Sequence, residues 1–234
     1  MADLIWKGAT PVSTQFDDVY FSAEDGLAES TYVFLEGNNL PERLQNQQTP
    51  HTIYELGFGT GLNFLVLFQL WNKSDRKNAI NFVSVEKYPL GFADMEKSLR
   101  VWQGVEAEVD AFLEKYPRNT LQEGWYHIEI VEGLTLSLFI GEGLDMLKTA
   151  KAEGIKPADA WFLDGFAPSK NPDMWTPEVF ENMAKLSMAG TTFATFTAAG
   201  VVRRGLQDVG FEVRKVKGFG RKRDMTVGKL CASL

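Results

Sequence analysis

The feature that most constrains the fold is a glycine-rich stretch at residues 55–61, between a short apolar run and a longer apolar segment of helical length. Glycine lets the backbone approach a ligand closely, because no side chain intervenes. Dinucleotide-binding folds carry Gly-x-Gly-x-x-Gly at such a junction, whereas this stretch reads Gly-x-Gly-x-Gly behind an acidic residue. The spacing indicates a ligand-binding turn between a strand and a helix, and it disfavours a nicotinamide cofactor.

The rest of the chain supports an α/β fold, because from His51 onward short apolar runs alternate with amphipathic helical segments. Strands are expected over 52–56, 81–85, 127–131, 134–140, 159–163, 191–196, 211–216 and 225–232. Helices are expected over 62–71, from Pro89 to Trp102, and over 105–116, 144–152, 177–190 and 201–209. The pattern predicts a Rossmann-like, doubly wound domain with helices on both faces of a mostly parallel, seven-stranded sheet whose final pair is antiparallel.

The length and composition suit one folded unit, since 234 residues with 44% hydrophobic content can bury a sizeable core. Residues 1–50 are expected to form an N-terminal cap packed on a core formed by residues 51–234. A single cysteine and two histidines leave no basis for a disulfide or a zinc cluster, so no metal site is expected. The absence of a signal-peptide pattern and of a membrane-length apolar run favours a cytoplasmic location without a membrane partner.

The charges near the glycine stretch indicate a cationic ligand. No Lys-Ser or Lys-Thr follows the stretch, and Glu55 would repel phosphate groups. Carboxylates would instead favour S-adenosylmethionine, which carries a sulfonium and an ammonium group. Glu86 ends the next expected strand, where open α/β sheets place acceptors for ribose hydroxyls. A simple tight turn would explain the glycines alone, but the position of Glu86 disfavours that interpretation.

Further cofactor contacts are expected at the same edge of the sheet. Glu142 follows the expected hairpin in a Gly-Glu-Gly sequence, where it would either reach the adenine amino group or remain a solvated carboxylate in a turn. The cofactor-binding residues expected from the sequence are Glu55, Gly57, Phe58, Gly59, Thr60, Gly61, Asn63, Glu86, Lys87, Glu142 and Asp164.

Two other regions stand out. Residues 164–175 form a long loop, rich in proline and aromatic residues, at the carboxyl end of a buried strand, and a simple connection would not require such a loop. The chain has a net charge of −7, yet residues 203–223 hold eight Lys and Arg side chains against two carboxylates, a local balance of +6. That basic segment is either a solvated surface or a contact for phosphate groups.

Several long segments resemble the methyltransferase domain of the MnmC family, which completes 5-methylaminomethyl-2-thiouridine at the tRNA wobble position. The resemblance covers nearly the whole chain and is carried by residues 16–21, 32–35, 57–64, 164–175, 194–197, 202–206 and 217–223. Two positions depart from the family pattern. Glu142 stands where Asp is common, which preserves the carboxylate, and Thr31 stands where Arg is expected, which weakens a substrate contact.

The resemblance implies a class I methyltransferase that uses S-adenosylmethionine to N-methylate the 5-aminomethyl group of a wobble (2-thio)uridine. It also implies two partners, the anticodon stem-loop of tRNA and a flavin-dependent oxidase that is either fused or a separate chain. In this reaction a neutral amine displaces the sulfonium in line, so alignment and the exclusion of water are the main tasks of the enzyme.

The resemblance places Asp164 beside the acceptor amine as the catalytic residue. An ordinary carboxylate, with a pKa near ~4, is a poor base for an alkylamine with a pKa near ~10, so Asp164 is expected to orient the amine and stabilise its growing positive charge. Phe166 and Pro168 would shape the wall that excludes water, although core packing is the alternative for Phe166 and Trp175. The expected substrate-binding residues are Tyr20, Phe166, Pro168, Lys170, Asn171, Trp175, Arg203, Arg204, Arg221, Lys222 and Arg223.

Two other functions remain open at this point. A methyltransferase of a small-molecule or protein amine would keep the cofactor site without an RNA surface. A non-catalytic S-adenosylmethionine-binding module would keep only the fold, although the intact glycine stretch and Glu86 argue against such decay.

Overall fold

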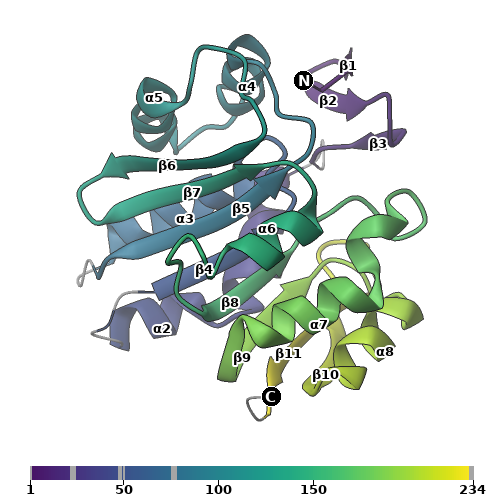
Figure 1. Ribbon diagram of the computed structural model, residues 1–234. Helices are drawn as coiled ribbons and strands as arrows, with labels where there is room; N and C mark the ends of the chain where they lie inside the picture. Colours follow the sequence, from purple (N-terminus) through teal and green to yellow (C-terminus); the bar gives the residue numbers. More distant parts are fainter. Residues whose placement is uncertain (1, 22–24, 47–48, 50, 75–77, 232–234) are drawn as a thin grey trace.

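The computed structural model describes residues 2–21, 25–46, 49, 51–74 and 78–231. A large central sheet runs through the described part of the chain, with its strands in the order β10-β11-β9-β8-β4-β5-β7-β6 (Figure 1). Its strands are β4 (His51–Leu56), β5 (Ile80–Glu86), β6 (Gly124–Val131), β7 (Leu134–Ile140), β8 (Ala158–Leu163), β9 (Ser187–Thr195), β10 (Phe211–Lys217) and β11 (Asp224–Leu230).

The sheet has the expected Rossmann-like topology. β4 pairs in parallel with β5 and β8, β5 with β7, and β8 with β9, so the carboxyl ends of these strands lie at one edge. β11 is antiparallel to both β9 and β10. The described residues give eight strands in this sheet, one for each of the eight segments expected from the sequence, so the stated total of seven was one too few. β6 and β7 form the expected antiparallel hairpin, which turns at Glu132 and Gly133 and places β6 at the edge.

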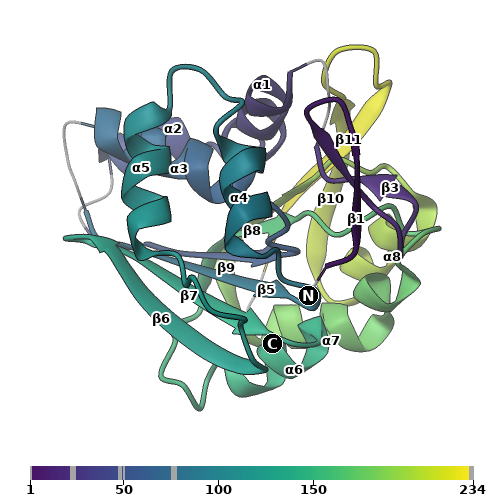
Figure 2. The same ribbon diagram turned by 90° about the horizontal axis from the view of Figure 1, so that it is seen from above.

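Helices cover both faces of the sheet (Figure 2). One face carries α3 (Leu62–Lys73), α4 (Phe92–Leu99) and α5 (Glu106–Lys115), and the other carries α6 (Gly143–Thr149), α7 (Pro177–Lys185) and α8 (Gly200–Asp208). The α3 helix is buried on most sides, as its apolar sequence predicts. The buried residues of α3 are Leu62, Asn63, Phe64, Leu65, Val66, Leu67, Phe68 and Trp71.

The described residues before β4 fall into two parts. β1 (Leu4–Lys7), β2 (Thr10–Ser13) and β3 (Asp18–Val19) form a small separate sheet, which we call the N-terminal sheet. It is attached near α4, where the Ala2 amide donates to the Pro89 carbonyl at 3.0 Å. The second part consists of α1 (Gly26–Ser30), the π-helix η1 (Thr31–Glu36) and α2 (Leu40–Asn46). Its buried residues Val33, Phe34, Leu35, Leu40 and Leu44 join the hydrophobic core of the sheet and α3.

Four of the expected helix boundaries are wrong by three residues or more. The α4 helix ends at Leu99 and not at Trp102, and α6 ends at Thr149 and not at residue 152. Pro89 lies in the loop before α4, which begins at Phe92 after the N-cap Gly91. The α7 helix begins at Pro177 with Thr176 as its cap, as expected, but ends at Lys185 and not near Gly190. It ends early because Ser187 already belongs to β9 and pairs with Ala158 of β8. Ala232, the expected end of the last strand, lies outside the described residues.

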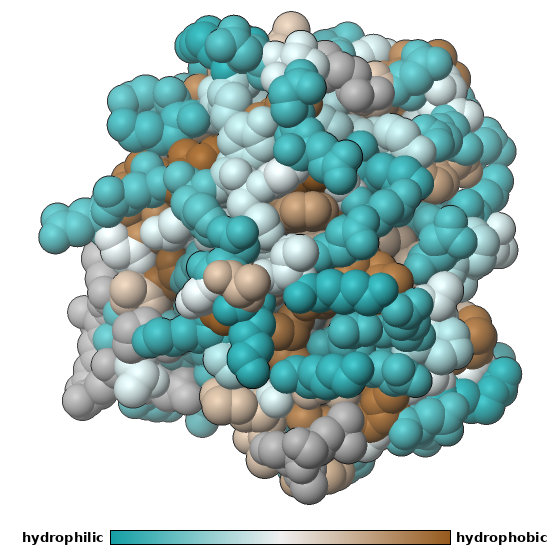
Figure 3. All heavy atoms as spheres, in the orientation of Figure 1, coloured by the Kyte–Doolittle hydropathy of each residue, from teal (hydrophilic) through white to brown (hydrophobic). Residues whose placement is uncertain are grey.

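The exterior is mainly polar on the face drawn in Figure 3, with hydrophobic side chains in small groups between hydrophilic ones. Within the described ranges, no helix combines the length and apolar character needed to cross a membrane.

Candidate active site

A cavity of about 1260 Å³ opens at the carboxyl ends of β4, β5 and β8. In open α/β sheets this edge is where ligands bind, and the volume exceeds that of a typical single-ligand pocket. The cavity can therefore hold a cofactor and an acceptor group together. The residues expected from the sequence that line it are Gly57, Phe58, Gly59, Thr60, Asn63, Glu86, Lys87, Glu142, Asp164, Tyr20, Phe166, Asn171 and Lys222.

The glycine stretch forms the floor of the cavity between β4 and α3. Gly57 has a φ of +100°, which L side chains rarely adopt, and a Cβ atom there would lie 2.3 Å from the Asp164 carbonyl oxygen. Gly61, with a φ of +73°, is the N-cap of α3. The Asp164 amide donates to the Leu56 carbonyl at 3.1 Å, so the glycine stretch and Asp164 are held directly against each other.

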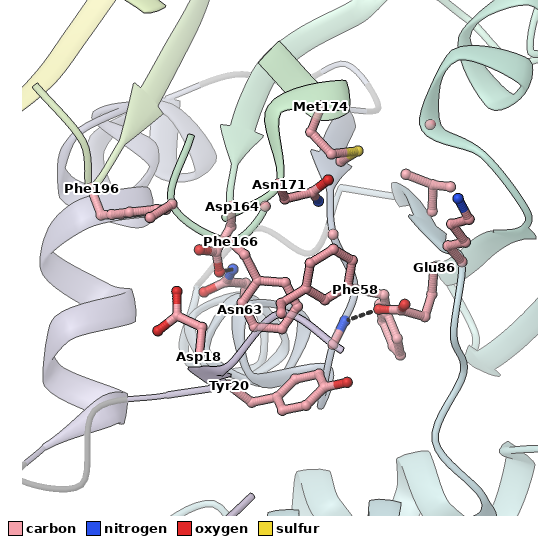
Figure 4. A pocket seen from close by; sticks show the side chains of 18 of the residues that line it. Asp18, Tyr20, Phe58, Asn63, Glu86, Asp164, Phe166, Asn171, Met174 and Phe196 are labelled. Atoms are coloured by element: carbon pink, nitrogen blue, oxygen red, sulfur yellow. Dashed lines mark hydrogen bonds between the residues drawn. The ribbon is translucent and has the colours of Figure 1, made fainter. Parts of the chain in front are cut away.

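Glu86 lies at the end of β5, beside the glycine stretch. Its carboxylate accepts hydrogen bonds from the backbone amides of Gly59 and Tyr88, each at 2.8 Å. Burial raises the pKa of Glu86, and these amide bonds act in the opposite direction. Figure 4 shows Glu86 on one side of the cavity and Asp164, Asn63 and Phe196 on the other, with Phe166 between.

A buried amide links two carboxyl groups under the floor of the cavity. Asn63 Nδ2 donates to Glu55 Oε1 at 2.9 Å and to Asp164 Oδ2 at 2.6 Å. The second Glu55 oxygen accepts a hydrogen bond from Ser84 Oγ at 2.5 Å. Burial raises the pKa of Glu55 to about 8 and that of Asp164 to about 7. A cation bound nearby would favour the ionised form of each group, and an anion would oppose it.

The residues present fit S-adenosylmethionine. Gly57 and Gly59 let bare backbone line the cavity, because a Cβ atom at Gly57 would lie 2.3 Å from the Asp164 carbonyl oxygen and one at Gly59 would lie 3.1 Å from the Tyr20 ring. Asn63 Oδ1 is buried and has no hydrogen-bond partner within the described part of the chain, so it is available to a donor such as an ammonium group. Asp164, which lines the cavity, adds a carboxyl group whose ionised form a cationic ligand would favour.

Lys87 and Glu142 form an ion pair at the rim of the cavity, with side-chain exposures of 42% and 51%. This pair raises the pKa of Lys87, and Glu142 follows β7 directly before α6. The adenine contact expected for Glu142 stays a prediction, since the carboxylate is already paired with Lys87.

One wall of the cavity is aromatic. Phe166 packs edge-on against Tyr20, with ring centroids 5.3 Å apart, and stacks on Phe16 at 4.6 Å. Burial raises the pKa of Tyr20 well above its usual range, so this residue remains a neutral phenol. Side chains from the N-terminal sheet region therefore complete the cavity beside the 164–175 loop.

Three residues expected to contact the substrate occupy other positions. Trp175 is buried, with 5% exposure, and its Nε1 donates to the Phe166 carbonyl at 3.2 Å, so it supports the loop from beneath. Pro168 and Lys170 lie outside the cavity lining. Lys170 Nζ instead pairs with Asp17 Oδ2 at 3.1 Å, which joins the 164–175 loop to the N-terminal sheet.

The basic residues divide between the surface and the cavity. Asp224 has three basic neighbours, Lys215, Arg223 and Arg203. The hydrogen bond from Lys215 lowers the pKa of Asp224 most, and the positive charges lower it further. α8, β10 and the β10–β11 turn therefore share one basic surface. Arg204 and Arg221 are exposed. Lys222 instead lines the cavity.

Several cavity residues escaped sequence analysis, and the clearest are Phe16, Asp18, Glu29 and Phe196. Phe16, Asp18 and Phe196 lie within segments that carry the family resemblance, which was the available signal. Glu29 had no such signal, because it lies in a short helix whose position depends on the tertiary fold.

The strand order with an antiparallel β11, the glycine stretch after β4 and the acidic residue ending β5 define a class I methyltransferase that uses S-adenosylmethionine. Residues 103–231 match a family described as S-adenosyl-L-methionine-dependent methyltransferase, and the chain belongs to this family. The protein is therefore an enzyme that transfers a methyl group from S-adenosylmethionine.

Relatives of known name extend the match. The chain is 48% identical over 231 residues to the tRNA 5-methylaminomethyl-2-thiouridine biosynthesis bifunctional protein MnmC of Methylobacillus flagellatus, covering 97% of this chain and 35% of that protein. It is 47% identical to the protein of the same name from Vibrio campbellii, covering 98% and 35%. The chain thus spans about a third of the length of these relatives.

The fold also has a counterpart among solved structures. The crystal structure of MNMC2 from Aquifex aeolicus superposes with a TM-score of 0.77 at 23% identity, covering 99% of this chain and 71% of that one. The similarity confirms the fold over nearly the whole chain.

Glu86→Ala should weaken S-adenosylmethionine binding by about 10- to 100-fold, because a charge-assisted pair of hydrogen bonds to the ribose is lost. Isothermal titration calorimetry measures this directly. Glu142→Gln is the matched control at the same rim and should cause a smaller loss, since Glu142 is half exposed and already paired. An unchanged affinity in Glu86→Ala would remove Glu86 from the cofactor site.

Proposed function

We propose that this chain N-methylates the 5-aminomethyl group of a wobble (2-thio)uridine in tRNA, giving 5-methylaminomethyl-2-thiouridine. The observation that carries the proposal is the near half-identity, over 97% of the chain, to proteins named for biosynthesis of this nucleoside. A cytoplasmic location follows from a tRNA substrate.

The cofactor site is assigned to the glycine stretch, with Asn63 and Asp164 facing the charged methionine end, Glu86 facing the ribose, and Glu55 supporting Asn63 from beneath. When bound, S-adenosylmethionine supplies a methyl group on a positively charged sulfur. The carbonyl ends of β4 and β8 fix the glycine stretch and Asp164 relative to each other through the bond from the Asp164 amide to Leu56. This arrangement supplies the alignment on which an in-line displacement depends.

Asp164 is assigned as the catalytic residue. Its side chain is within the cavity lining, so it can accept a hydrogen bond from the entering amine. The amine must lose a proton during the reaction. Because burial raises the pKa of Asp164 to about 7, Asp164 can accept this proton more readily than an ordinary carboxylate can. Its negative form stabilises the ammonium that develops on the nitrogen.

The aromatic wall is assigned to the base. Phe166, Tyr20 and Phe16 form a continuous cluster that can pack against a uracil ring and keep water from the reacting atoms. Asn171, from the same loop, lines the cavity and offers an amide for hydrogen bonding. An unpaired wobble base is free to enter such a pocket without breaking a base pair.

The basic surface around Asp224 is assigned to the tRNA backbone. Arg203 and Arg223 act on Asp224, and the exposed Arg204 and Arg221 lie close to them in sequence. All four are assigned to phosphates of the anticodon stem-loop, since phosphate contacts position an RNA without reaching its bases. The bifunctional relatives are about three times as long as this chain, so an oxidase domain, fused or separate, is the proposed second partner.

The proposal is tested by incubating the protein with S-adenosylmethionine and tRNA that bears 5-aminomethyl-2-thiouridine, followed by nucleoside mass spectrometry. A mass gain of one methyl group on the wobble nucleoside is expected, with no gain on tRNA that has 2-thiouridine at that position. A free alkylamine serves as the alternative acceptor. Efficient methylation of that amine, with none of the tRNA, would favour a small-molecule methyltransferase.

A further inference from the structure

The turn between β10 and β11 presents its three adjacent cations in different ways. Arg221 and Arg223 are exposed, and the Arg223 side chain is 94% accessible. Lys222 instead forms an ion pair with Glu29 of α1, a side chain that is only 14% accessible. Lys222 Nζ also lies 5.7 Å from the centroid of the Phe196 ring. The phosphate-binding role expected from the sequence therefore fits Arg221 and Arg223 better than Lys222.

Lys222 reaches the active-site cavity, although 53% of its side chain is accessible to solvent. Glu29, Phe196 and Lys222 line the same cavity as Asp164. The charges of Glu29 and Lys222 also reach Asp164, since Glu29 raises its pKa and Lys222 lowers it, in addition to the larger effect of burial. The ion pair thus lies within electrostatic reach of the catalytic carboxylate.

The chemistry of this subsite matches the substrate. Lys222 ends in a primary alkylammonium, the same group as a protonated aminomethyl substituent. A carboxylate and an aromatic face are the two elements that recognise such a cation. We propose that Glu29 is a specificity-determining residue that binds the substrate's amino group, and that Lys222 occupies this subsite until the substrate displaces it.

This exchange keeps the charges balanced. A largely buried carboxylate is costly without a cation, so Lys222 compensates Glu29 in the empty enzyme. A substrate ammonium replaces Lys222 charge for charge and leaves the lysine free to move towards solvent, where half of its side chain already lies. The bound ammonium then passes one proton to Asp164, and the neutral amine that remains is the nucleophile. A wobble base without the aminomethyl group offers no such replacement, so the pair disfavours its entry. The inference rests on the proposed tRNA substrate and assigns how its amine is recognised.

The test compares the affinity for tRNA with 5-aminomethyl-2-thiouridine and for the same tRNA with 2-thiouridine, in the presence of S-adenosylhomocysteine. The wild-type enzyme should prefer the amine-bearing tRNA by about tenfold or more, the value of one charged hydrogen bond. Glu29→Gln should reduce this preference to near one. Lys222→Met should increase it, because the internal competitor is removed. Melting curves establish that each variant is folded.

Arg223→Met, next to Lys222 in the same turn, is the matched control for a phosphate contact. It should weaken the binding of both tRNAs equally. It should also reduce the slope of log affinity against log salt concentration by about one. The inference is overturned if Glu29→Gln keeps the wild-type preference, or if Lys222→Met behaves like Arg223→Met. Failure of the wild-type enzyme to methylate the amine-bearing tRNA would instead contradict the proposed function, so the two failures are distinguishable.

Discussion

Asp164→Asn should slow single-turnover methyl transfer by about 10²- to 10³-fold, the usual effect of removing one electrostatic contact in a transition state. The substitution keeps the side-chain size and an oxygen for the hydrogen bond from Asn63, but removes the charge that offsets the developing ammonium. Affinity for S-adenosylmethionine should change much less than the rate. Rapid-quench transfer to amine-bearing tRNA measures the effect, and calorimetry measures the affinity.

Asp173→Asn is the matched control, because Asp173 is an exposed carboxylate of the same loop that also borders the cavity. It should leave the rate within a few-fold of the wild-type value. A folded Asp164→Asn protein with a near-normal rate would contradict the catalytic assignment. Reduced thermal stability with normal turnover per folded molecule would indicate a structural role instead.

The same residue predicts a pH dependence. Burial raises the pKa of Asp164 to about 7, so the carboxyl is protonated below that pH and loses its negative charge. The value of kcat/KM for S-adenosylmethionine, which reports the free enzyme, should therefore fall as the pH drops through about 7. The positive sulfur of the bound cofactor favours the ionised form of Asp164. In the profile of kcat against pH, the fall caused by protonation of Asp164 should therefore lie at lower pH than in the profile of kcat/KM. Asp164→Asn should remove the limb that Asp164 causes.

Gly57→Ala should disrupt the cofactor site more than any other single methyl addition in the glycine stretch. Its φ of +100° is strained for alanine, and the new Cβ atom would lie 2.3 Å from the Asp164 carbonyl oxygen, which is backbone and cannot rotate away. The glycine stretch and the end of β8 must then separate. A misplacement of about 1 Å between reacting groups costs on the order of 10²-fold in rate, and S-adenosylmethionine binding should weaken with it.

Gly154→Ala separates backbone strain from the clash. Gly154 also has a positive φ, +74°, but a Cβ atom there would meet nothing within 4 Å. The strain of about 1–2 kcal/mol should lower its melting temperature by a few degrees and leave cofactor affinity unchanged. Equal effects of the two substitutions on affinity would show that the close approach of Gly57 to Asp164 has no part in binding.

Local patterns were sufficient to predict the central sheet. A strand or helix can be predicted where residues adjacent in sequence determine it, as the alternating apolar runs and the helix cap at Thr176 and Pro177 do. Strands and helices with such local signals were found where they were expected. The ends of elements were less predictable, because pairing with a distant strand decides them. The α7 helix ends where Ser187 pairs with Ala158, and its own sequence does not encode that contact.

The same distinction applies to the site. Gly57 and Glu86 follow strands directly, so the fold alone brings them to the cavity. The directions of individual side chains depend on contacts between remote segments. Trp175 turns inward because its Nε1 donates a hydrogen bond to the Phe166 carbonyl. Lys222 turns away from its two arginine neighbours because it pairs with Glu29, which lies 193 residues earlier in the sequence. The charge pattern of the sequence could not reveal that Lys222 contacts the cavity while Arg221 and Arg223 are exposed on the surface.

The hydrogen bond between the Asp164 amide and the Leu56 carbonyl has a consequence for the order of events in catalysis. It makes the cofactor floor and the catalytic carboxylate parts of one rigid strand pair at the centre of the sheet. The walls that precede β4 or connect β10 with β11 lie outside this strand pair. These walls can open and close around substrate and product while the distance between the glycine stretch and Asp164 stays the same.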